Sequence, residues 1–106
     1  MTTRKVMAEV LPQGEDEQII YRFDFANIAA ILGAVVSINA VTIYSETDHV
    51  DTSGVNLLGA SALLGNIIST PLVLDLEEKH LYRLTVSANF PLAQIVSAYI
   101  LIKGER

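Results

Sequence analysis

The residues of this chain that could carry chemistry gather in two polar segments, "SETDHVDTSG" at 45–54 and "EEKH" at 77–80. The metal-ligating side chains of interest are Glu46, Asp48, His49, Asp51 and His80. Calcium prefers carboxylate oxygens, but the spacing from Asp48 to Asp51 is not that of an EF-hand loop. The two histidines show no recognised zinc spacing. We therefore expect solvated loops and no metal site, and ion binding by the loop 45–54 stays an open alternative.

No spacing typical of a catalytic or cofactor-binding motif occurs. Asp48, His49 and Ser53 are neighbours within one loop, and polar residues of this kind commonly cluster in loops. The nucleophile motif G-x-S-x-G, a Gly-rich phosphate loop and H-E-x-x-H are all missing from the sequence. We predict a protein that is not an enzyme, with no catalytic residues, no cofactor and no small-molecule substrate.

Composition narrows the class of partner. The chain has 106 residues, which is the usual size of one domain, and we expect a single domain over 1–106. Its formal net charge is −5, and its seven basic residues form no cluster of the kind that phosphate binding needs. Cysteine is absent, so disulfides and thiolate metal sites are excluded. Direct nucleic-acid binding is therefore not expected.

Three long stretches contain no charged residue: Phe25–Ser45, Thr52–Leu74 and Leu84–Ile102. Each is long enough to cross a bilayer as a helix. The first is flanked by Asp24 and Glu46, however, and lacks the Lys/Arg bias that orients membrane spans. The stretches also contain several amides and prolines, and many of their apolar residues are β-branched, as in strands. We expect buried sheet and no membrane partner; a small membrane protein such as a holin is the alternative.

Polar residues alternate with apolar ones wherever they interrupt the apolar runs. In "QIIYRFDF" Phe23 and Phe25 share one face while Arg22 and Asp24 share the other, and in "LYRLTVSA" the residue pairs alternate in the same way. This period of two is typical of half-buried strands. About seven strands are predicted, near Lys5–Leu11, Gln18–Phe25, Val35–Tyr44, within 55–66, and at Ile67–Leu76, Leu81–Ala88 and Gln94–Lys103.

Three details refine this pattern. Residues 26–33 suit either one short helix or a wide loop. The polar residues of Val35–Tyr44 do not keep one parity, which indicates a bulge or burial on both faces. Tyr82 follows a charged corner, where Greek-key sandwiches often place a tyrosine whose hydroxyl bonds to backbone. Strand spacing and this corner predict an all-β sandwich.

The order "YRFDF", Gly33, "VVSINAV", "VLDL", "LYRLTVSA" and "AYILIKGER" resembles the small immunoglobulin-like virion proteins of tailed bacteriophages. The resemblance extends from Tyr21 to Lys103, although "EEKH" stands where those proteins have a Gly-rich step. It implies an immunoglobulin-like, antiparallel β-sandwich of about seven strands. It also implies a structural role without catalysis, either in capsid decoration or in the head–tail connection at the neck.

The partners implied by this resemblance are other virion proteins (major capsid, portal or tail subunits) and further copies of the chain itself. The protein would be located in the virion, after assembly in the host cytoplasm. The virion position, the copy number and symmetry, and the identity of the neighbouring subunit stay open. A carbohydrate-binding adhesin module is a further alternative, but the chain has no Trp to provide an aromatic platform.

Overall fold

The computed structural model describes residues 2–5 and 10–105. It is a mostly β protein, with 53% strand and 11% helix, so the predicted all-β character is confirmed at that level. The helices are α1 (Ala26–Leu32) and α2 (Ser53–Asn56). The strands are β1 (Thr2–Lys5), β2 (Leu11–Gly14), β3 (Arg22–Asp24), β4 (Ser37–Ser45), β5 (Val50–Asp51), β6 (Leu57–Leu58), β7 (Ala62–Leu64), β8 (Ile67–Ser69), β9 (Leu72–Val73), β10 (Leu81–Phe90) and β11 (Gln94–Glu105).

The largest sheet is mixed and follows the order β1-β11-β10-β4-β5, with β2 also pairing β11. Strands β10 and β11 form a long antiparallel hairpin in continuous register from Leu81–Lys103 to Phe90–Gln94. The predicted strands at Leu81–Ala88 and Gln94–Lys103 are confirmed, and both extend slightly further. This hairpin forms the centre of the molecule.

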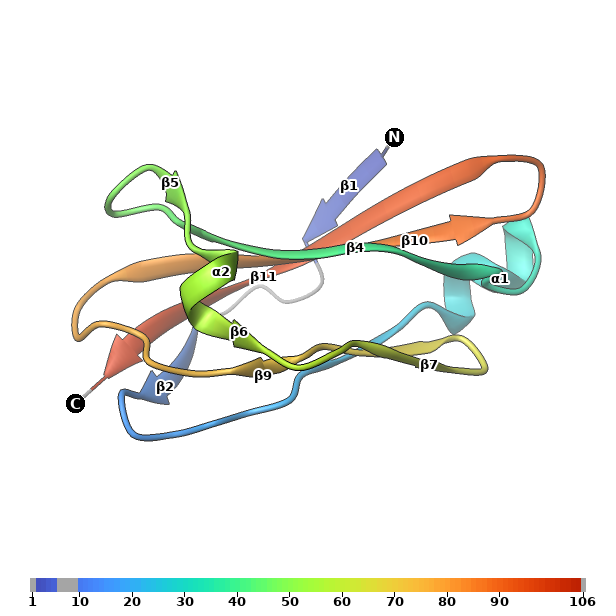
Figure 1. The fold of residues 1–106 in the computed structure, drawn as a ribbon. Helices are drawn as coiled ribbons and strands as arrows, with labels where there is room; N and C mark the ends of the chain where they lie inside the picture. Colours follow the sequence, from blue (N-terminus) through green and yellow to red (C-terminus); the bar gives the residue numbers. More distant parts are fainter. Residues whose placement is uncertain (1, 6–9, 106) are drawn as a thin grey trace.

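Two smaller sheets, β3-β8-β7 and β6-β9, lie across from one face of the mixed sheet (Figure 1). The core fills the space between these layers. From the mixed sheet it takes Ile43, Leu84 and Ile102, and from the smaller sheets Ile68 and Val73, all fully buried. The apolar face predicted for "LYRLTVSA" is confirmed, because Tyr82, Leu84, Val86 and Ala88 are all buried. Ser87, predicted on the outward face, is buried as well.

A bulge interrupts the pairing of β4 with β10. Ser87 pairs with Ala40 while the next residue, Ala88, pairs with Ile38, so Asn39 has no partner opposite it. Asn39 is exposed. The inserted residue shifts side-chain parity along β4, which explains the mixed polar pattern of Val35–Tyr44 and confirms the predicted bulge.

The expected number and direction of strands were wrong. Eleven strands are present in the described residues instead of about seven, because Gly59, Gly65 and Pro71 divide the middle of the chain into short pieces. The sheet is not antiparallel throughout, since β1 and β2 both run parallel to β11. Parallel pairing is available here because these strands come from opposite ends of the chain and no tight turn constrains their direction. Of the predicted strand Lys5–Leu11, residues 6–9 lie outside the described part.

The uncharged stretches form strands, turns and the two short helices α1 and α2. Residues 26–32 adopt α1, so the helix alternative is correct for this segment. Within residues 2–5 and 10–105, no helix has the length and apolar character needed to span a membrane.

Candidate functional site

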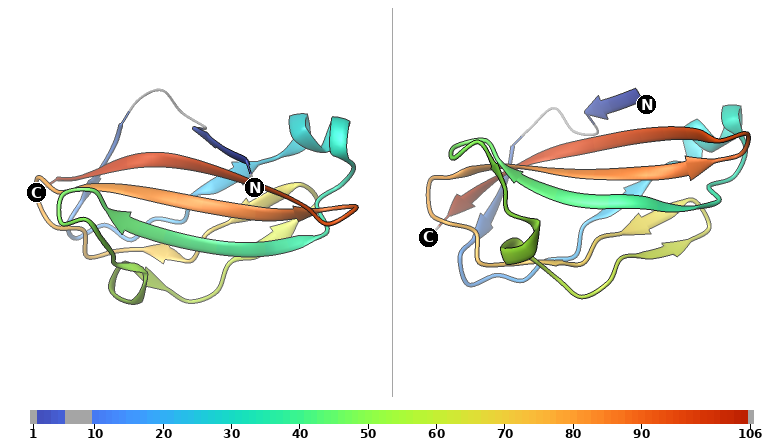
Figure 2. Two further views of the ribbon diagram at one scale, coloured as in Figure 1. Left: turned by 90° about the horizontal axis from the view of Figure 1, so that it is seen from above. Right: turned by 45° about the horizontal axis from the view of Figure 1, so that its top comes forward.

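The molecule is elongated, with principal dimensions of 42 × 23 × 21 Å, and its two ends differ in character. At one end lie the turn 14–17, the loop 46–49 and the corner 75–80, which we call the acidic end (Figures 1 and 2). Apart from Asp24, the acidic residues that the structure describes lie in or beside these segments: Glu15, Asp16, Glu17, Glu46, Asp48, Asp51, Asp75, Glu77, Glu78 and Glu105. The electrostatics of this end therefore suit cationic partners.

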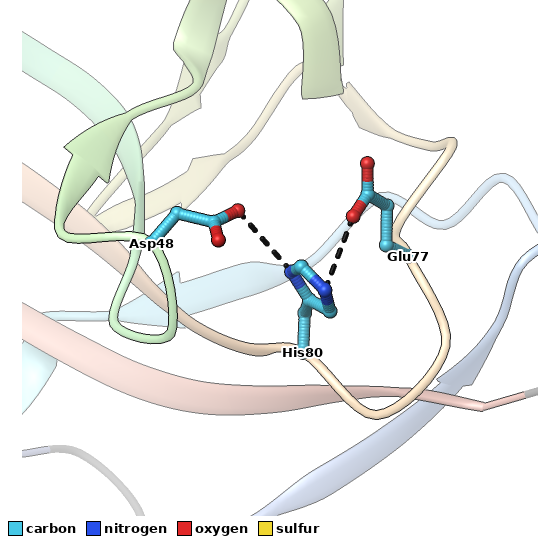
Figure 3. A group of neighbouring side chains, drawn as sticks. All are labelled: Asp48, Glu77 and His80. Atoms are coloured by element: carbon cyan, nitrogen blue, oxygen red, sulfur yellow. Dashed lines mark ion pairs between the residues drawn. The ribbon is translucent and has the colours of Figure 1, made fainter.

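His80 lies between Asp48 and Glu77 at the acidic end (Figure 3). Its Nδ1 lies 3.3 Å from Oδ2 of Asp48, and its Nε2 lies 3.1 Å from Oε2 of Glu77. Each ring nitrogen faces its own carboxylate at ion-pair distance. The ring thereby joins the loop after β4 to the corner before β10.

Within residues 2–5 and 10–105, the same three residues form a group that could hold a metal ion, since their ligand atoms lie within 4.8 Å of one another. The observed orientation suits ion pairs better than coordination. A single ion binds one imidazole nitrogen, yet Asp48 and Glu77 approach different nitrogens of the ring. Coordination by all three would require His80 or one carboxylate to rotate. Of the carboxylates in the loop 45–54, Asp48 is the one that belongs to this group.

The corner is fixed by Tyr82. Its hydroxyl accepts a hydrogen bond of 2.9 Å from the backbone N–H of Glu77, which confirms the predicted tyrosine corner. Burial raises the pKa of the Tyr82 hydroxyl above its ordinary value, so the proton stays on the oxygen across a wider range of pH. The ring of His80 stacks on that of Tyr82, with 6.4 Å between centroids.

Gly104 in β11 allows the corner to pack closely on the sheet. The Lys79 N–H donates to its carbonyl at 2.9 Å, and its own N–H donates to the His80 carbonyl at 2.9 Å. A Cβ atom at this position would lie 2.0 Å from the carbonyl oxygen of Glu77. Only glycine fits such a close approach of two backbones.

An acidic depression of about 280 Å³ adjoins the corner. It is lined by Glu15, Asp16, Asp75, Leu76 and Glu77. Glu77 therefore belongs to both the depression and the His80 cluster. Four carboxylates around one hollow favour a Lys or Arg side chain of a partner.

A series of hydrogen bonds through the buried Gln13 side chain lies next to the turn 14–17. Gln13 is fully buried, and its Nε2 donates to the carbonyl of Val73 at 2.7 Å. The Tyr21 hydroxyl donates to Oε1 of Gln13 at 2.8 Å. Burial, with a smaller contribution from the charge of Glu17, raises the pKa of Tyr21 to about 12.

The opposite end, which we call the apolar end, consists of α1, the linker 33–36, the turn 64–67 and the hairpin turn 91–93. None of these segments contains a charged residue, and Figures 1 and 2 show them together at one extremity. Large aliphatic side chains protrude here, with exposed fractions of 84% for Ile31, 82% for Leu64 and 92% for Leu92. The three uncharged stretches of the sequence thus converge on one surface.

Hydrogen bonds hold the segments of the apolar end in place. The side-chain carbonyl of Asn66 accepts from the N–H of Val35 at 3.0 Å, and its backbone carbonyl accepts from Phe25 at 2.9 Å. The N–H of Val36 donates to the Asn89 carbonyl at 2.8 Å. The exposed aliphatic side chains are therefore carried on a fixed frame.

The structure places the polar residues that the sequence analysis singled out in separate contacts. Asp48, His49 and Ser53 do not act together: Asp48 pairs with His80, His49 is exposed, and the Ser53 hydroxyl accepts from the Ile43 N–H at 2.9 Å. Asp48 and His80 lie in different loops, so no short sequence motif connects them, and the sequence analysis missed their contact. The available signal was strand pairing, because β4 ends where β10 begins.

Comparisons of the chain with protein-family models, with curated protein sequences and with solved structures gave no match.

Proposed function

We propose that this protein is a structural component of a tailed-phage particle, either a capsid decoration protein or a head–tail component, built as an immunoglobulin-like β-sandwich. The observation that carries the proposal is the pair of dissimilar contact surfaces at opposite ends of one elongated domain. A subunit that must bind neighbours on two sides needs such surfaces, one apolar and one charged.

Two features support the sandwich assignment. Apolar residues from facing sheet layers form one core, as in Figure 1. The hydrogen bond from the Glu77 N–H to the Tyr82 hydroxyl is of the kind found at the tyrosine corner of Greek-key sandwiches. The parallel edge formed by β1 and β2 adds to this arrangement without changing the facing layers.

The mechanism is adhesion without catalysis. When a neighbour covers the apolar end, the side chains of Ile31, Leu64 and Leu92 are removed from water. The favourable free energy is roughly 25 cal/mol for each Å² of apolar surface buried. The acidic end adds orientation and faster encounter with a basic neighbour more than it adds affinity. Repetition of these modest contacts over many copies in a particle produces a strong overall attachment.

Immunodetection on particles tests this proposal. An antiserum raised against the purified chain should label particles purified from a lysate of cells that carry the gene. Immunogold electron microscopy should place the label at one fixed location, and quantitative mass spectrometry should find many copies per particle. A chain that stays entirely in the supernatant, while the particles form normally, would refute the assignment.

A further inference from the structure

The hairpin turn at the apolar end has an unfavourable backbone for its residues. Leu92 and Ala93 both adopt left-handed conformations, with φ of 64° and 59°. They lie in the turn between the paired residues Phe90 and Gln94. Turns of this conformation favour Gly or Asn, and a left-handed residue with a larger side chain costs roughly 1–2 kcal/mol. The turn therefore carries a leucine at the expense of local stability.

The Leu92 side chain contributes almost no buried apolar surface to the folded single chain. Leu92 is 92% exposed, which makes it the most exposed large hydrophobic residue of the described part. A strained residue whose side chain reaches into solvent is a sign of a role outside the fold. That role requires an apolar receptor.

A receptor of suitable character lies on the same end of the molecule. Helix α1 carries an apolar depression of about 230 Å³, lined by Asn27, Ile28, Ile31 and Leu32. The helix ends against the hairpin turn, since a Cβ at Gly33 would lie 3.0 Å from Cγ of Pro91. A protruding aliphatic side chain and an apolar hollow are thus adjacent on one surface. Adjacent complementary features of this kind permit reciprocal contact across a twofold axis.

We infer that the apolar end binds the apolar end of a second copy, with Leu92 of each chain seated in the α1 depression of the other. Charge distribution favours this occupant. The chain has a net charge of −5, and the contact joins segments without charge while it keeps the acidic ends of both copies far apart. The inference deepens the proposed function and rests on it for its biological setting, since particle subunits occur in many copies.

Sedimentation velocity of the purified full chain from about 1 to 200 μM tests the inference, this range covering weak to moderate dimer affinities. The chain should shift from monomer to dimer within this range. Leu92→Gly should weaken the dimer at least tenfold, because it removes the protruding side chain, and it should not unfold the chain, because glycine suits the backbone.

Ala93→Gly is the matched control, since it changes the neighbouring left-handed residue without removing a large side chain. It should leave the dimer unchanged. Ile31→Asp should disrupt the dimer, whereas Val55→Asp, at a residue that is 70% exposed in α2 and outside the apolar end, should not. A wild-type chain that remains monomeric at 200 μM, or a dimer that Leu92→Gly leaves intact, overturns the inference.

Disulfide trapping locates the contact, because the chain contains no native cysteine. A mixture of Leu92→Cys and Ile31→Cys chains should form mixed disulfide dimers on mild oxidation, in excess over a mixture of Leu92→Cys and Val55→Cys. Equal yields would refute the seated arrangement. Flotation with neutral phosphatidylcholine vesicles serves as the opposing arm: binding that Leu92→Gly abolishes, without self-association, assigns the apolar end to lipid and overturns the inference. These results concern the surface alone, so either proposal can fail while the other stands.

Discussion

The acidic end and the apolar end are built by opposite strategies. At the acidic end, side-chain and backbone contacts cross-link the segments: Tyr82 holds the corner, His80 bridges two loops, and Gly104 allows two backbone segments to approach closely. At the apolar end, hydrogen bonds to Asn66 hold the segments in place, while Leu92 and Ile31 protrude and the hairpin turn is strained. The difference is that specific side-chain interactions hold the acidic end, whereas the apolar end leaves large aliphatic side chains exposed to solvent.

The largest effect is expected from Gly104→Ala at the acidic end. The new Cβ would overlap the Glu77 carbonyl, so the corner must move away from β11. We expect a loss of about 3 kcal/mol in the free energy of unfolding, measured by urea titration.

Gly54→Ala is its matched control. Nothing lies within 4 Å of a Cβ at Gly54, and this residue is in helix α2. Alanine should therefore be neutral or stabilising by up to about 1 kcal/mol. Equal destabilisation by both substitutions would contradict the role given to the corner.

Tyr82→Phe should follow in magnitude. It removes the acceptor of the Glu77 N–H and leaves that group without its partner, at a cost of about 1–3 kcal/mol. Tyr44→Phe is the comparison, since the Tyr44 ring lies beneath Arg83 and can remain there. A cost for Tyr82→Phe no greater than for Tyr44→Phe would show that the tyrosine corner adds nothing to stability.

Alkaline pH should weaken the fold through Tyr21. An unfolded tyrosine ionises near pH 10, whereas the pKa of Tyr21 in the folded chain is about 12. Between these values the unfolded state releases a proton that the folded state keeps, so the free energy of unfolding falls as pH rises from 10 to 12. Below pH 10 this contribution is fully present.

Tyr21→Phe should reduce that decline, measured by urea unfolding at several pH values. Comparison of the two chains at pH 8, where the phenol is neutral in both states, isolates the loss of the hydrogen bond to Gln13. A decline that is identical in both chains would mean that another group is responsible.

The smallest effect on stability is expected at the apolar end. Leu92→Gly and Ala93→Gly each remove a left-handed non-glycine residue, so each should raise the free energy of unfolding by up to about 1 kcal/mol. Thermal unfolding at low protein concentration, where self-association is absent, measures this. A loss of more than 1 kcal/mol for Leu92→Gly would show that the leucine serves the fold itself.

Sequence patterns predicted the long regular elements of this fold. The alternation in "LYRLTVSA" predicted the buried apolar face of β10, and the charged corner predicted the role of Tyr82. The irregular parity of Val35–Tyr44 favoured either a bulge or burial on both faces, and the structure has the bulge, at Asn39. Local periodicity suffices for such elements because each strand shows its own inside and outside.

Local periodicity could not predict the short strands, nor the contacts that form the acidic end and the apolar end. The pairing of β2 with β11 joins residues about ninety positions apart, and the contact between Asp48 and His80 depends on two loops meeting after strand pairing. The strain at Leu92 has no sequence signal, because a Pro-Leu-Ala turn resembles an ordinary loop. Contacts between distant segments are set by the fold and leave little trace in local sequence.

The parallel pairing of β2 with β11 has a mechanical consequence. Tension applied before Leu11 and after Glu105 would pull these neighbouring strands past each other along their length, since they run in the same direction. All their hydrogen bonds would then share the load at once, whereas an antiparallel terminal pair would open one bond at a time. Forced unfolding is governed by the height of that barrier. Extension between these two points is therefore expected to load this pair in shear.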